Sequence, residues 1–539
     1  MGLDPKTLIF SEDFSGPLSA AKWKPNVGPG SFLGNTQQRT TLPVVVDGHA
    51  VLQLDTYNPT GLSYFGSEMI SVPTFDVNTQ GPLIFQATLT YEQAQKGLIG
   101  GFFTLGQGAP GTNGHDEIDI ELMSKFDSQF QTNIYHQAQY DNGNPISYSP
   151  DGYSQQVEHV YKFEWLPNGV VKWYVDDVAY RTVIATTPTP SSGLPGGPGT
   201  PDQPQNLHFN IWVGYPDWPV SDPSLPPPTS NPSQNATFKL DVSAVSVWTG
   251  SSLNGSAAAN ALAGTAGGEY IDGGAGDDTI AGGGGDDVIE GGLGVDTALY
   301  SGLARNYEMS VTAGVAVAVA DRLGVEGQDI LTNVEAIRFA DQTLDTTSLI
   351  RASNLDASSF MPIIDLYNAT LDRAPDALGL AYWASRLADG MSLTDIAESF
   401  YSSAEGHALR PVAPSNAALV SNAYAEILDR AADAEGQAYW MGQLESGNLT
   451  QATFLLAFVQ GVTGAEDVAT LVSKQTMGVY YAITNGLTDA ENARTVFVSD
   501  PLASKTMTDA FAVAAASAET AELIVKLVGV NLEMFSSAT

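Results

Sequence analysis

Cysteine is absent from the chain, and basic residues are scarce. The lack of cysteine among 539 residues excludes disulfides and thiolate metal sites, although it does not assign a compartment. Sixty acidic residues against 22 basic ones give a net charge of −38. This charge disfavours binding to nucleic acid or to anionic membrane surfaces, and it suits a protein that binds hard cations such as Ca2+.

The sequence also lacks a long hydrophobic run. No segment reaches the about 18 apolar residues of a membrane-spanning helix, so we expect no membrane span. The stretch MGLDPKTLIFSEDF has no basic region followed by a long apolar one. We therefore expect that, if the protein is exported, its signal is not N-terminal.

What is present divides the chain into regions, and its length favours several domains. Residues 1–248 contain short β-rich runs such as AVLQLDTY, LIFQATLTY and LHFNIWVG, separated by Gly, Pro, Asn and Asp. This pattern predicts an all-β sandwich or barrel. Two proline-rich segments inside it, TTPTPSSGLPGGPGTP and YPDWPVSDPSLPPPTSNP, are predicted to be long surface loops.

Residues 249–299 contain a nine-residue repeat, seen in GGAGDDTIA, GGGGDDVIE and GGLGVDTAL. These units resemble the RTX-type nonapeptide of a calcium-binding parallel β-roll. Glycines let the turn backbone direct carbonyls at an ion, and aspartate adds a charged oxygen. A flexible Gly/Asp linker is the alternative, but it would not require an apolar residue at every ninth position. The predicted metal-site residues of the roll are Asp278, Asp287, Asp296, Gly274, Gly276, Gly283 and Gly285.

Residues 300–350 return to short strands and are predicted to be a β-rich flank of the roll. Residues 351–539 are Ala-rich and predicted to be all-α, with a repeated pair, LDRAPDALGLAYW and LDRAADAEGQAYW. The pair resembles tandem DUF4214 modules, helical units of unassigned role in large bacterial secreted and surface proteins. A structural loop role is favoured over a functional one for the shared Arg373 and Arg430.

The stretch GHDEIDIELM places three acids on alternate positions, Glu117, Asp119 and Glu121. On a strand all three share one face, and the Cα atoms of the outer two are roughly 13 Å apart. If the two glutamates lean together, their carboxyls approach to about 5–6 Å, which suits a retaining glycosidase (about 5–5.5 Å) better than an inverting one (about 6.5–9.5 Å). A solvated acidic face and a metal site are the alternatives. Three close carboxyls cannot all ionise freely, so at least one is expected to titrate high, as a general acid requires.

The surroundings of this motif resemble glycoside hydrolase family 16, whose members include retaining endo-β-glucanases and laminarinases. The segments that agree in order include FSEDFSGPLSAAKW, FGSEMIS, VYKFEWLPNGVVKWYVDD, NLHFNIWVG and KLDVSAVSVW. The resemblance implies a β-jelly-roll sandwich over most of residues 8–248. It also implies that Glu117 is the nucleophile, Asp119 its assisting acid and Glu121 the acid/base.

Further residues carry over from the resemblance. His115, Asn133 and His136 are candidate substrate contacts, with an ordinary strand-edge role as the alternative for His115. The candidate sugar-stacking platforms, which are core residues in the alternative reading, are Trp165, Trp173 and Trp212. Asp241 matches the position of a structural calcium ligand in some members. Many relatives carry tryptophans where KGLIGGFFTLG has Ile99, Phe102 and Phe103.

The segments FLGNTQQR, LQLDTYNP and SYFGSEMIS look closer to the glycanases that rhizobia export to trim exopolysaccharides such as succinoglycan. Those enzymes carry calcium nonapeptides and leave through type I secretion with an uncleaved C-terminal signal. The resemblance implies a secreted protein with LIVKLVGVNLEMFSSAT as a candidate signal.

The sequence therefore predicts a multidomain protein: an all-β jelly-roll sandwich, a parallel β-roll with a β flank, and an all-α C-terminal region. The predicted activity is that of a secreted retaining endo-β-glycanase acting on a β-1,3/1,4-type glucan or a bacterial exopolysaccharide, with Ca2+ bound by the roll. Transglycosylation on the same fold is one alternative. Others are a non-catalytic polysaccharide-binding adhesin, attached to a cell surface or matrix through the helical repeats, and a calcium-dependent matrix protein.

Overall fold

The computed structural model describes residues 2–27, 32–107, 115–136, 139–140, 145–184, 201, 203–312, 316–410, 414–495 and 522–528. The chain divides into two compact units. The first comprises Met1–Leu253, Gly267–Ile271 and Gly285–Asp287. The second comprises Asn254–Ala266, Asp272–Gly284 and Val288–Thr539.

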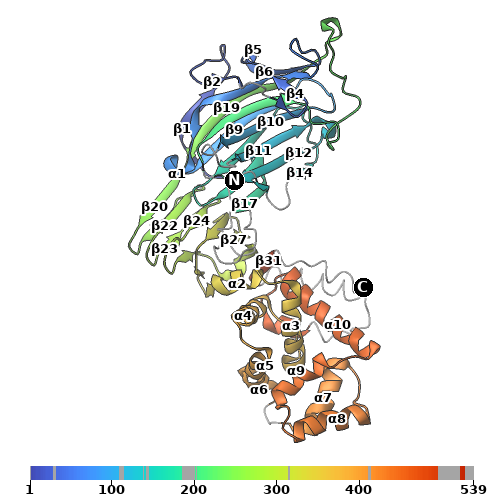
Figure 1. Cartoon of the computed structure of the whole chain (residues 1–539). Coiled ribbons are helices and arrows are strands. Elements are labelled where there is room, and N and C mark those ends of the chain that lie inside the picture. The colour runs from blue at the N-terminus through green and yellow to red at the C-terminus, as the bar shows by residue number, and fades with distance from the viewer. Residues whose placement is uncertain are drawn as a thin grey trace. The chain divides into compact units, whose positions relative to one another are not determined.

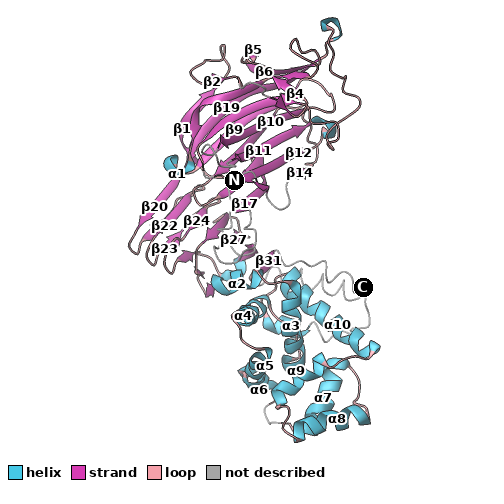
Figure 2. Cartoon of the chain, viewed as in Figure 1, coloured by secondary structure: helices cyan, strands magenta, loops and turns pink. Residues whose placement is uncertain are grey.

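Two large sheets form the first unit (Figures 1 and 2). The eleven-stranded sheet has the order β17-β16-β15-β9-β19-β6-β7-β4-β3, with β1 on β19 and β5 on β6. Its strands are β1 (Pro5–Glu12), β3 (Phe32–Leu33), β4 (Thr36–Gln38), β5 (Val44–Val46), β6 (His49–Asp55), β7 (Tyr64–Gly66), β9 (Leu83–Tyr91), β15 (His159–Trp165), β16 (Val170–Val175), β17 (Val178–Ile184) and β19 (Thr237–Gly250).

The eight-stranded sheet has the order β13-β12-β11-β10-β18-β8-β2, with β14 on β12. Its strands are β2 (Trp23–Lys24), β8 (Glu68–Phe75), β10 (Ile99–Gln107), β11 (His115–Met123), β12 (Phe130–His136), β13 (Gln139–Tyr140), β14 (Ile146–Tyr148) and β18 (Gln205–Trp212). The short helices of this unit are α1 (Val77–Gln80), η1 (Ser124–Phe126) and η2 (Pro232–Gln234).

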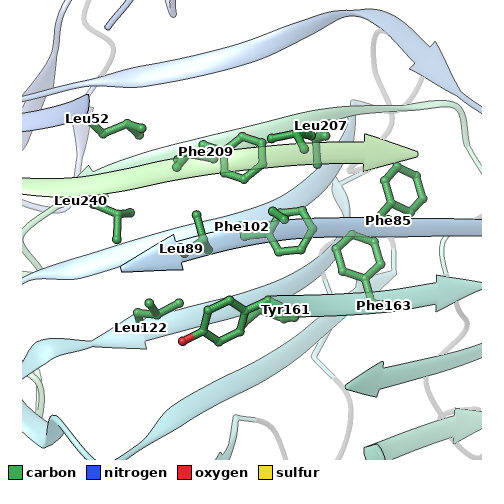
Figure 3. Close-up of a cluster of buried hydrophobic side chains, with 14 of the residues drawn as sticks. Leu52, Phe85, Leu89, Phe102, Leu122, Tyr161, Phe163, Leu207, Phe209 and Leu240 are labelled. Carbon is green, nitrogen blue, oxygen red and sulfur yellow. The ribbon is translucent and has the colours of Figure 1, made fainter. Parts of the chain in front are cut away.

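The core of the first unit lies between the two sheets. Alternate residues of each strand face inward, as in β9, where LIFQATLTY buries every second side chain along most of its length. Phe102 on β10 stacks on Phe209 of its own sheet at 5.2 Å between ring centroids, and lies 5.1 Å from Phe163 on β15 of the other sheet. Figure 3 shows these rings gathered with leucines of both sheets. Because apolar side chains of both sheets fill one interior, the fold is the β-sandwich expected from the sequence.

Twelve further strands and η3 (Ala304–Asn306) follow β19. They are β20 (Ser252–Ser256), β21 (Ala261–Ala263), β22 (Tyr270–Gly274), β23 (Thr279–Ala281), β24 (Val288–Glu290), β25 (Thr297–Leu299), β26 (Tyr307–Thr312), β27 (Ala316–Asp321), β28 (Gln328–Thr332), β29 (Ala336–Arg338), β30 (Thr343–Asp345) and β31 (Ile524–Val528).

The nonapeptide repeat winds into a parallel roll. In the second unit β21, β23 and β25 pair in parallel, with Leu262 opposite Ile280 and Ile280 opposite Ala298. Partners are therefore two nonapeptides apart, so one sheet receives every second repeat. On the far side of β25 the sheet continues with β29 in parallel and β30 antiparallel. The flank thus extends the roll beyond the last repeat, and β24 similarly continues into β28, β27, β26 and β31.

The remainder of the second unit is helical. Its helices are α2 (Thr346–Ser353), α3 (Ala357–Leu371), α4 (Ala377–Ala388), α5 (Leu393–Ser402), α6 (Ala404–Leu409), α7 (Asn416–Leu428), α8 (Ala434–Glu445), α9 (Gln451–Gln460), α10 (Ala465–Val479), the π-helix η4 (Tyr480–Thr484) and α11 (Ala490–Thr495). Across the described part of the chain, no single helix is long and apolar enough to span a bilayer; α9 together with α10 and η4, a pair bent by 108°, meets that length and composition.

The repeated arginines hold the turns between helices. Arg373 Nε donates to Glu405 at 2.7 Å, and its guanidinium lies 4.8 Å from the Tyr367 ring centroid. Arg430 repeats this arrangement with Asp467 at 2.7 Å and Tyr424 at 4.7 Å. In both copies, therefore, the arginine fixes the turn that precedes a helix, as favoured from the sequence.

Candidate active site

The acidic motif lies on β11, an interior strand of the eight-stranded sheet. β11 pairs without a bulge with β10 on one side, and with β12 on the other. Ile118, Ile120 and Leu122 are fully buried in the core. Because side chains alternate along a strand, Glu117, Asp119 and Glu121 project from the opposite face, as expected.

Two side chains of the opposite sheet hold the backbone of β11. Trp173 on β16 donates its indole N–H to the Asp119 carbonyl oxygen at 3.0 Å. Tyr91 on β9 donates its hydroxyl to the Leu122 carbonyl oxygen at 2.9 Å. Both donors are buried in the core, so the strand that carries the carboxyls is held by hydrogen bonds on its core side.

The three carboxyls open into a cleft of about 740 Å³. The strands β10, β11, β12 and β18 form its floor, where the cross-strand register places Gly101 beside Glu121 and Phe103 beside Asp119. The described residues that line the cleft are Asn26, Gln38, Glu68, Ile99, Gly101, Phe103, Leu105, Glu117, Asp119, Glu121, Met123, Phe126, Gln131, Asn133, Tyr135, Pro145, Ser147, Asn210, Trp212, Trp218, Pro219 and Val220.

Burial and mutual repulsion raise the pKa values of two of the three acids. Burial, followed by the charge of Glu117, raises the pKa of Glu121 to about 7. Burial, followed by the charge of Glu117 and a hydrogen bond with it, raises the pKa of Asp119 well above its usual range. Asn133 Nδ2 donates to Glu121 Oε2 at 3.1 Å and so orients that carboxyl. A protonated acid near neutral pH beside an acceptor carboxylate is the pairing that acid/base chemistry needs.

Several polar atoms of the cleft have no protein partner. Both amide atoms of Gln38 are buried without one, as are Asn133 Oδ1 and Asn210 Oδ1. Since buried polar groups are normally hydrogen-bonded, these atoms are candidates to bind a polar ligand. Glu68 accepts from Asn26 at 2.7 Å and contacts His208 Nδ1 at 2.9 Å, which fixes its carboxyl at the cleft wall.

Gln38, Asn26, Glu68 and Asn210 were not singled out from the sequence. Glu68 lies in FGSEMIS and Asn210 in NLHFNIWVG, two of the segments that carry the family resemblance. The spacing of Asn210 two residues before Trp212 is the signal that could have identified it, since both then lie on one face of β18.

The structure separates the three tryptophans. Trp212 lines the cleft and packs edge-on against Trp218 at 5.7 Å. Trp165 and Trp173 lie fully buried between the sheets, on strands of the opposite sheet. The expectation that these two stack on sugars is therefore wrong, because their indoles fill the core; Trp165 donates its N–H to the Pro201 carbonyl.

The three polar residues that were predicted to contact the substrate also differ in whether they face the cleft. Asn133 lines the cleft. His136 lies on the other face of β12, with Nδ1 3.3 Å from Asp116 Oδ1. The prediction that His136 faces the cleft is wrong, because three residues along a strand reverse the face. His115 begins β11, but its side chain is outside the described part of the structure.

Asp241 lies on β19, in the eleven-stranded sheet. Burial, followed by the charge of Glu92, raises its pKa, and its Oδ1 is buried without a hydrogen-bond partner. Within the described ranges no group of three or more His, Cys, Asp or Glu residues could hold a metal ion. A calcium ligand at Asp241 stays a prediction.

The roll has the backbone and the oxygens that Ca2+ requires. Its four predicted glycines adopt positive φ, which side chains rarely tolerate; the values are 92° (Gly274), 98° (Gly276), 105° (Gly283) and 93° (Gly285). Asp278 and Asp296 each keep a buried Oδ2 without a partner. Asp287 has one carboxyl oxygen bound, which accepts from the Glu269 N–H at 2.8 Å. Because no three of the described acids form a group that could hold an ion by themselves, carbonyl oxygens would supply most of the ligands here, as Ca2+ accepts.

Comparison with known proteins shows similarity in three regions. Residues 39–225 match the model of glycosyl hydrolases family 16. Residues 263–298 match the RTX calcium-binding nonapeptide repeat. Residues 348–410 and 411–465 match DUF4214, a domain of unknown function.

Individual relatives match about a quarter of the chain. The β-glucanase of Paenibacillus macerans is 33% identical over 124 residues, which are 23% of this chain and 45% of that protein. The xylanase/β-glucanase of Ruminococcus flavefaciens is 34% identical over 136 residues, 23% of this chain and 14% of that protein. The chain thus spans less than half the length of these two relatives.

Among solved structures, the endo-β-1,3-glucanase of Pyrococcus furiosus has a TM-score of 0.37 and 23% identity, over 46% of this chain and 97% of that one. Matches to glycosyl hydrolases family 16, to RTX nonapeptide repeats and to two DUF4214 copies therefore occur in one chain, as the resemblance predicted.

Proposed function

We propose that the protein is a retaining endo-β-glycanase that hydrolyses internal β-glycosidic bonds of a β-glucan or a related exopolysaccharide. The observation that carries the proposal is the row of three carboxyls in the cleft, one with a pKa raised to about 7. The match of residues 39–225 to glycosyl hydrolases family 16 supports it.

In the proposed first step, the Glu117 carboxylate attacks the anomeric carbon while Glu121 donates its proton to the leaving oxygen. The glycosidic bond breaks as a glycosyl-Glu117 ester forms. In the second step Glu121, now a carboxylate, takes a proton from water, and the hydroxide displaces Glu117 from the sugar. Both residues return to their starting protonation states.

Asp119 has a supporting part in this scheme. It lies between the two glutamates in sequence, and burial together with the charge of Glu117 raises its pKa, which favours the form that donates a hydrogen bond to Glu117. A neutral neighbour that donates to Glu117 orients the nucleophile without adding a second negative charge beside it. Loss of this proton would restore repulsion between adjacent carboxylates.

The cleft dimensions and its polar groups suit a chain-like sugar polymer. Trp212 and the more exposed Trp218 line the cleft, and Gln38, Asn133 and Asn210 offer unsatisfied amide atoms. The names of the relatives favour a β-glucan as substrate. The rhizobial resemblance favours a bacterial exopolysaccharide such as succinoglycan instead, and a substrate panel separates the two.

We further propose that the protein acts outside the cell, exported by a type I secretion machinery. The RTX repeats support this, because Ca2+ is abundant there and scarce in the cytosol. The candidate C-terminal signal LIVKLVGVNLEMFSSAT extends beyond the described residues. Attachment to a surface or matrix through the DUF4214 modules is part of the same proposal.

The proposal is tested with the calcium-loaded full chain on a panel of β-glucans and exopolysaccharides, by viscosity and by reducing ends. We expect wild type to reduce viscosity rapidly and Glu117→Gln to lose this activity. Glu92→Gln is the matched control, since it removes an exposed carboxyl paired with Lys239 on the other sheet. Binding of a polymer without cleavage by folded wild type would favour the adhesin, and longer products formed without a net gain of reducing ends would favour transglycosylation.

A further inference from the structure

One edge of the roll is built from turns that stack two nonapeptides apart, and each turn presents the same contacts. The Asn260 N–H donates to Asp278 Oδ1 at 2.6 Å, and the Asp278 N–H donates to Asp296 Oδ1 at 2.7 Å. Each aspartate therefore uses one carboxyl oxygen to hold the preceding turn. The other oxygen, Oδ2, is buried without a partner in both Asp278 and Asp296.

The same ladder continues past the repeats. The Asp296 N–H donates to Glu335 Oε2 at 2.7 Å, so Glu335 takes the place that an aspartate has in the turns before it. Glu335 comes 39 residues after Asp296, beyond a hairpin, and outside the residues that match the RTX repeat (263–298). The sequence period of nine does not reveal it, because the chain returns to the roll at a different spacing.

Carbonyl oxygens complete the repeated pattern. A Cβ placed on Gly273 would lie 2.6 Å from Asp278 Oδ2 and would overlap the Gly291 carbonyl oxygen. A Cβ placed on Gly291 would lie 2.8 Å from Asp296 Oδ2 and would overlap the Asn333 carbonyl oxygen. At each of these two glycines, a carboxyl oxygen without a hydrogen-bond partner and a carbonyl oxygen of the next turn therefore lie close together. We call each such position a place.

The first turn of the stack differs in one chemical respect. A Cβ on Gly255 would lie 2.6 Å from Asn260 Oδ1 and overlap the Gly273 carbonyl oxygen. Asn260 Oδ1, however, already accepts from the Ser256 N–H at 2.6 Å and from its hydroxyl at 3.2 Å. The oxygen over Gly255 is therefore that of a neutral amide and already has donors. The oxygens over Gly273 and Gly291 belong to the carboxylates of Asp278 and Asp296 and have none.

The residues around the last place, at Asp296, are acidic. The neighbouring charges that act on the Asp296 carboxyl are those of Glu335, Asp278 and Asp277. Carboxylates gathered with carbonyl oxygens are the ligands that Ca2+ prefers, and they repel one another when no cation is present.

We infer that Asp296 Oδ2 and the Asn333 carbonyl oxygen, with Glu335 beside them, form a further Ca2+ site at the end of the roll. The flank that follows the repeats thus supplies ligands. On this edge the two charged places, at Asp278 and at Asp296, bind calcium, and the place at Asn260 does not.

The test is the calcium stoichiometry and affinity of the full chain, measured by isothermal titration calorimetry after removal of bound metal. We expect Glu335→Gln to bind one ion fewer than wild type, or one ion more weakly. The amide oxygen of the glutamine can still accept from the Asp296 N–H, so only the charge is removed. Glu308→Gln is the matched control on the same flank, because Glu308 pairs with Lys526 away from this edge. Titrations of Glu335→Gln and wild type that coincide would overturn the inference.

A second measurement does not depend on how a variant folds. Wild-type crystals grown with Tb3+ should show anomalous density within roughly 2.3–2.6 Å of both Asp296 Oδ2 and the Asn333 carbonyl oxygen. Density at Asp278 and Gly291 but none at Asp296 would contradict the inference. Neither result depends on whether the cleft cleaves a polysaccharide.

Discussion

The protonation of a single side chain, Glu121, decides whether the cleft can act as an acid. Its carboxyl is buried and faces the charge of Glu117, and Asn133 is its hydrogen-bond donor. Burial disfavours the charged form, so the folded protein keeps a proton on Glu121 that the unfolded chain would release. The raised pKa that suits an acid catalyst therefore lowers the stability of the folded protein above neutral pH.

This cost predicts the effect of Glu121→Gln. The pKa of Glu121 is raised from 4.5 to about 7, so its contribution to stability is full below about pH 4.5 and is lost as the pH rises through about 7. Glutamine cannot ionise, and near pH 8 the variant should be more stable than wild type by about 3 kcal/mol. Near pH 4 the two should unfold alike.

Thermal unfolding of both proteins across this pH range measures the difference, with Glu445→Gln as the control, because it removes an exposed carboxyl at the end of α8. If wild type and Glu121→Gln lose stability in parallel as the pH rises, the carboxyl is not held protonated by its surroundings. Activity is expected to be lost in Glu121→Gln at every pH.

At the scale of elements, the sequence predicted which side chains share one face of a strand better than it predicted which sheet the strand joins. Strand alternation placed Glu117, Asp119 and Glu121 together, and it also excludes His136 from the face of Asn133, three residues away. It does not tell which sheet a strand joins, so it could not separate Trp173, whose indole holds β11 from the core, from Trp212 in the cleft. Glu68 and Gln38 reach the cleft from β8 and β4, through tertiary pairing that no local pattern encodes.

In the roll, too, the local pattern was predicted from the sequence and the pairing of the strands was not. The period of nine identified the turns, whereas pairing two repeats apart became visible only in the structure. Glu335 was missed because a hairpin separates it from the repeats, although it occupies the same place in the ladder.

The turn backbone of the roll predicts the effect of adding one methyl group. Gly283 has a φ of 105°, and a Cβ there would overlap the Thr265 carbonyl oxygen. Gly283→Ala should destabilise the roll by on the order of 1–3 kcal/mol or more, the usual cost of such a backbone position, with the clash added. Gly284→Ala is the matched control, since its nearest atom would be 3.2 Å away. Calcium-dependent thermal unfolding measures both, and equal effects of the two substitutions would contradict the assignment of strain to Gly283.

At the scale of the whole molecule, the net charge of −38 opposes compaction unless cations are bound. In the roll the charges of Glu335, Asp278 and Asp277 act on the Asp296 carboxyl, whereas the sandwich has its own core of aromatic and aliphatic side chains. Calcium is therefore expected to stabilise the roll and leave the core of the sandwich unaffected.

Chelation tests this expectation. Removal of Ca2+ should lower the stability of β21, β23 and β25 by about 2.7 kcal/mol per site at a calcium concentration a hundredfold above Kd. Hydrogen exchange, measured with and without chelator, should therefore speed up in these strands and stay unchanged in β9 and β11. Unchanged exchange in the roll would mean that metal does not stabilise it.

The most direct test of the central claim is the anomeric configuration of the first product, followed by NMR during hydrolysis of a β-glucan or exopolysaccharide by the calcium-loaded chain. A double displacement at Glu117 and Glu121 predicts that the β-anomer forms first and mutarotates later, and that Glu117→Gln forms no product. First appearance of the α-anomer, or full activity in Glu117→Gln, would contradict the assignment of this site.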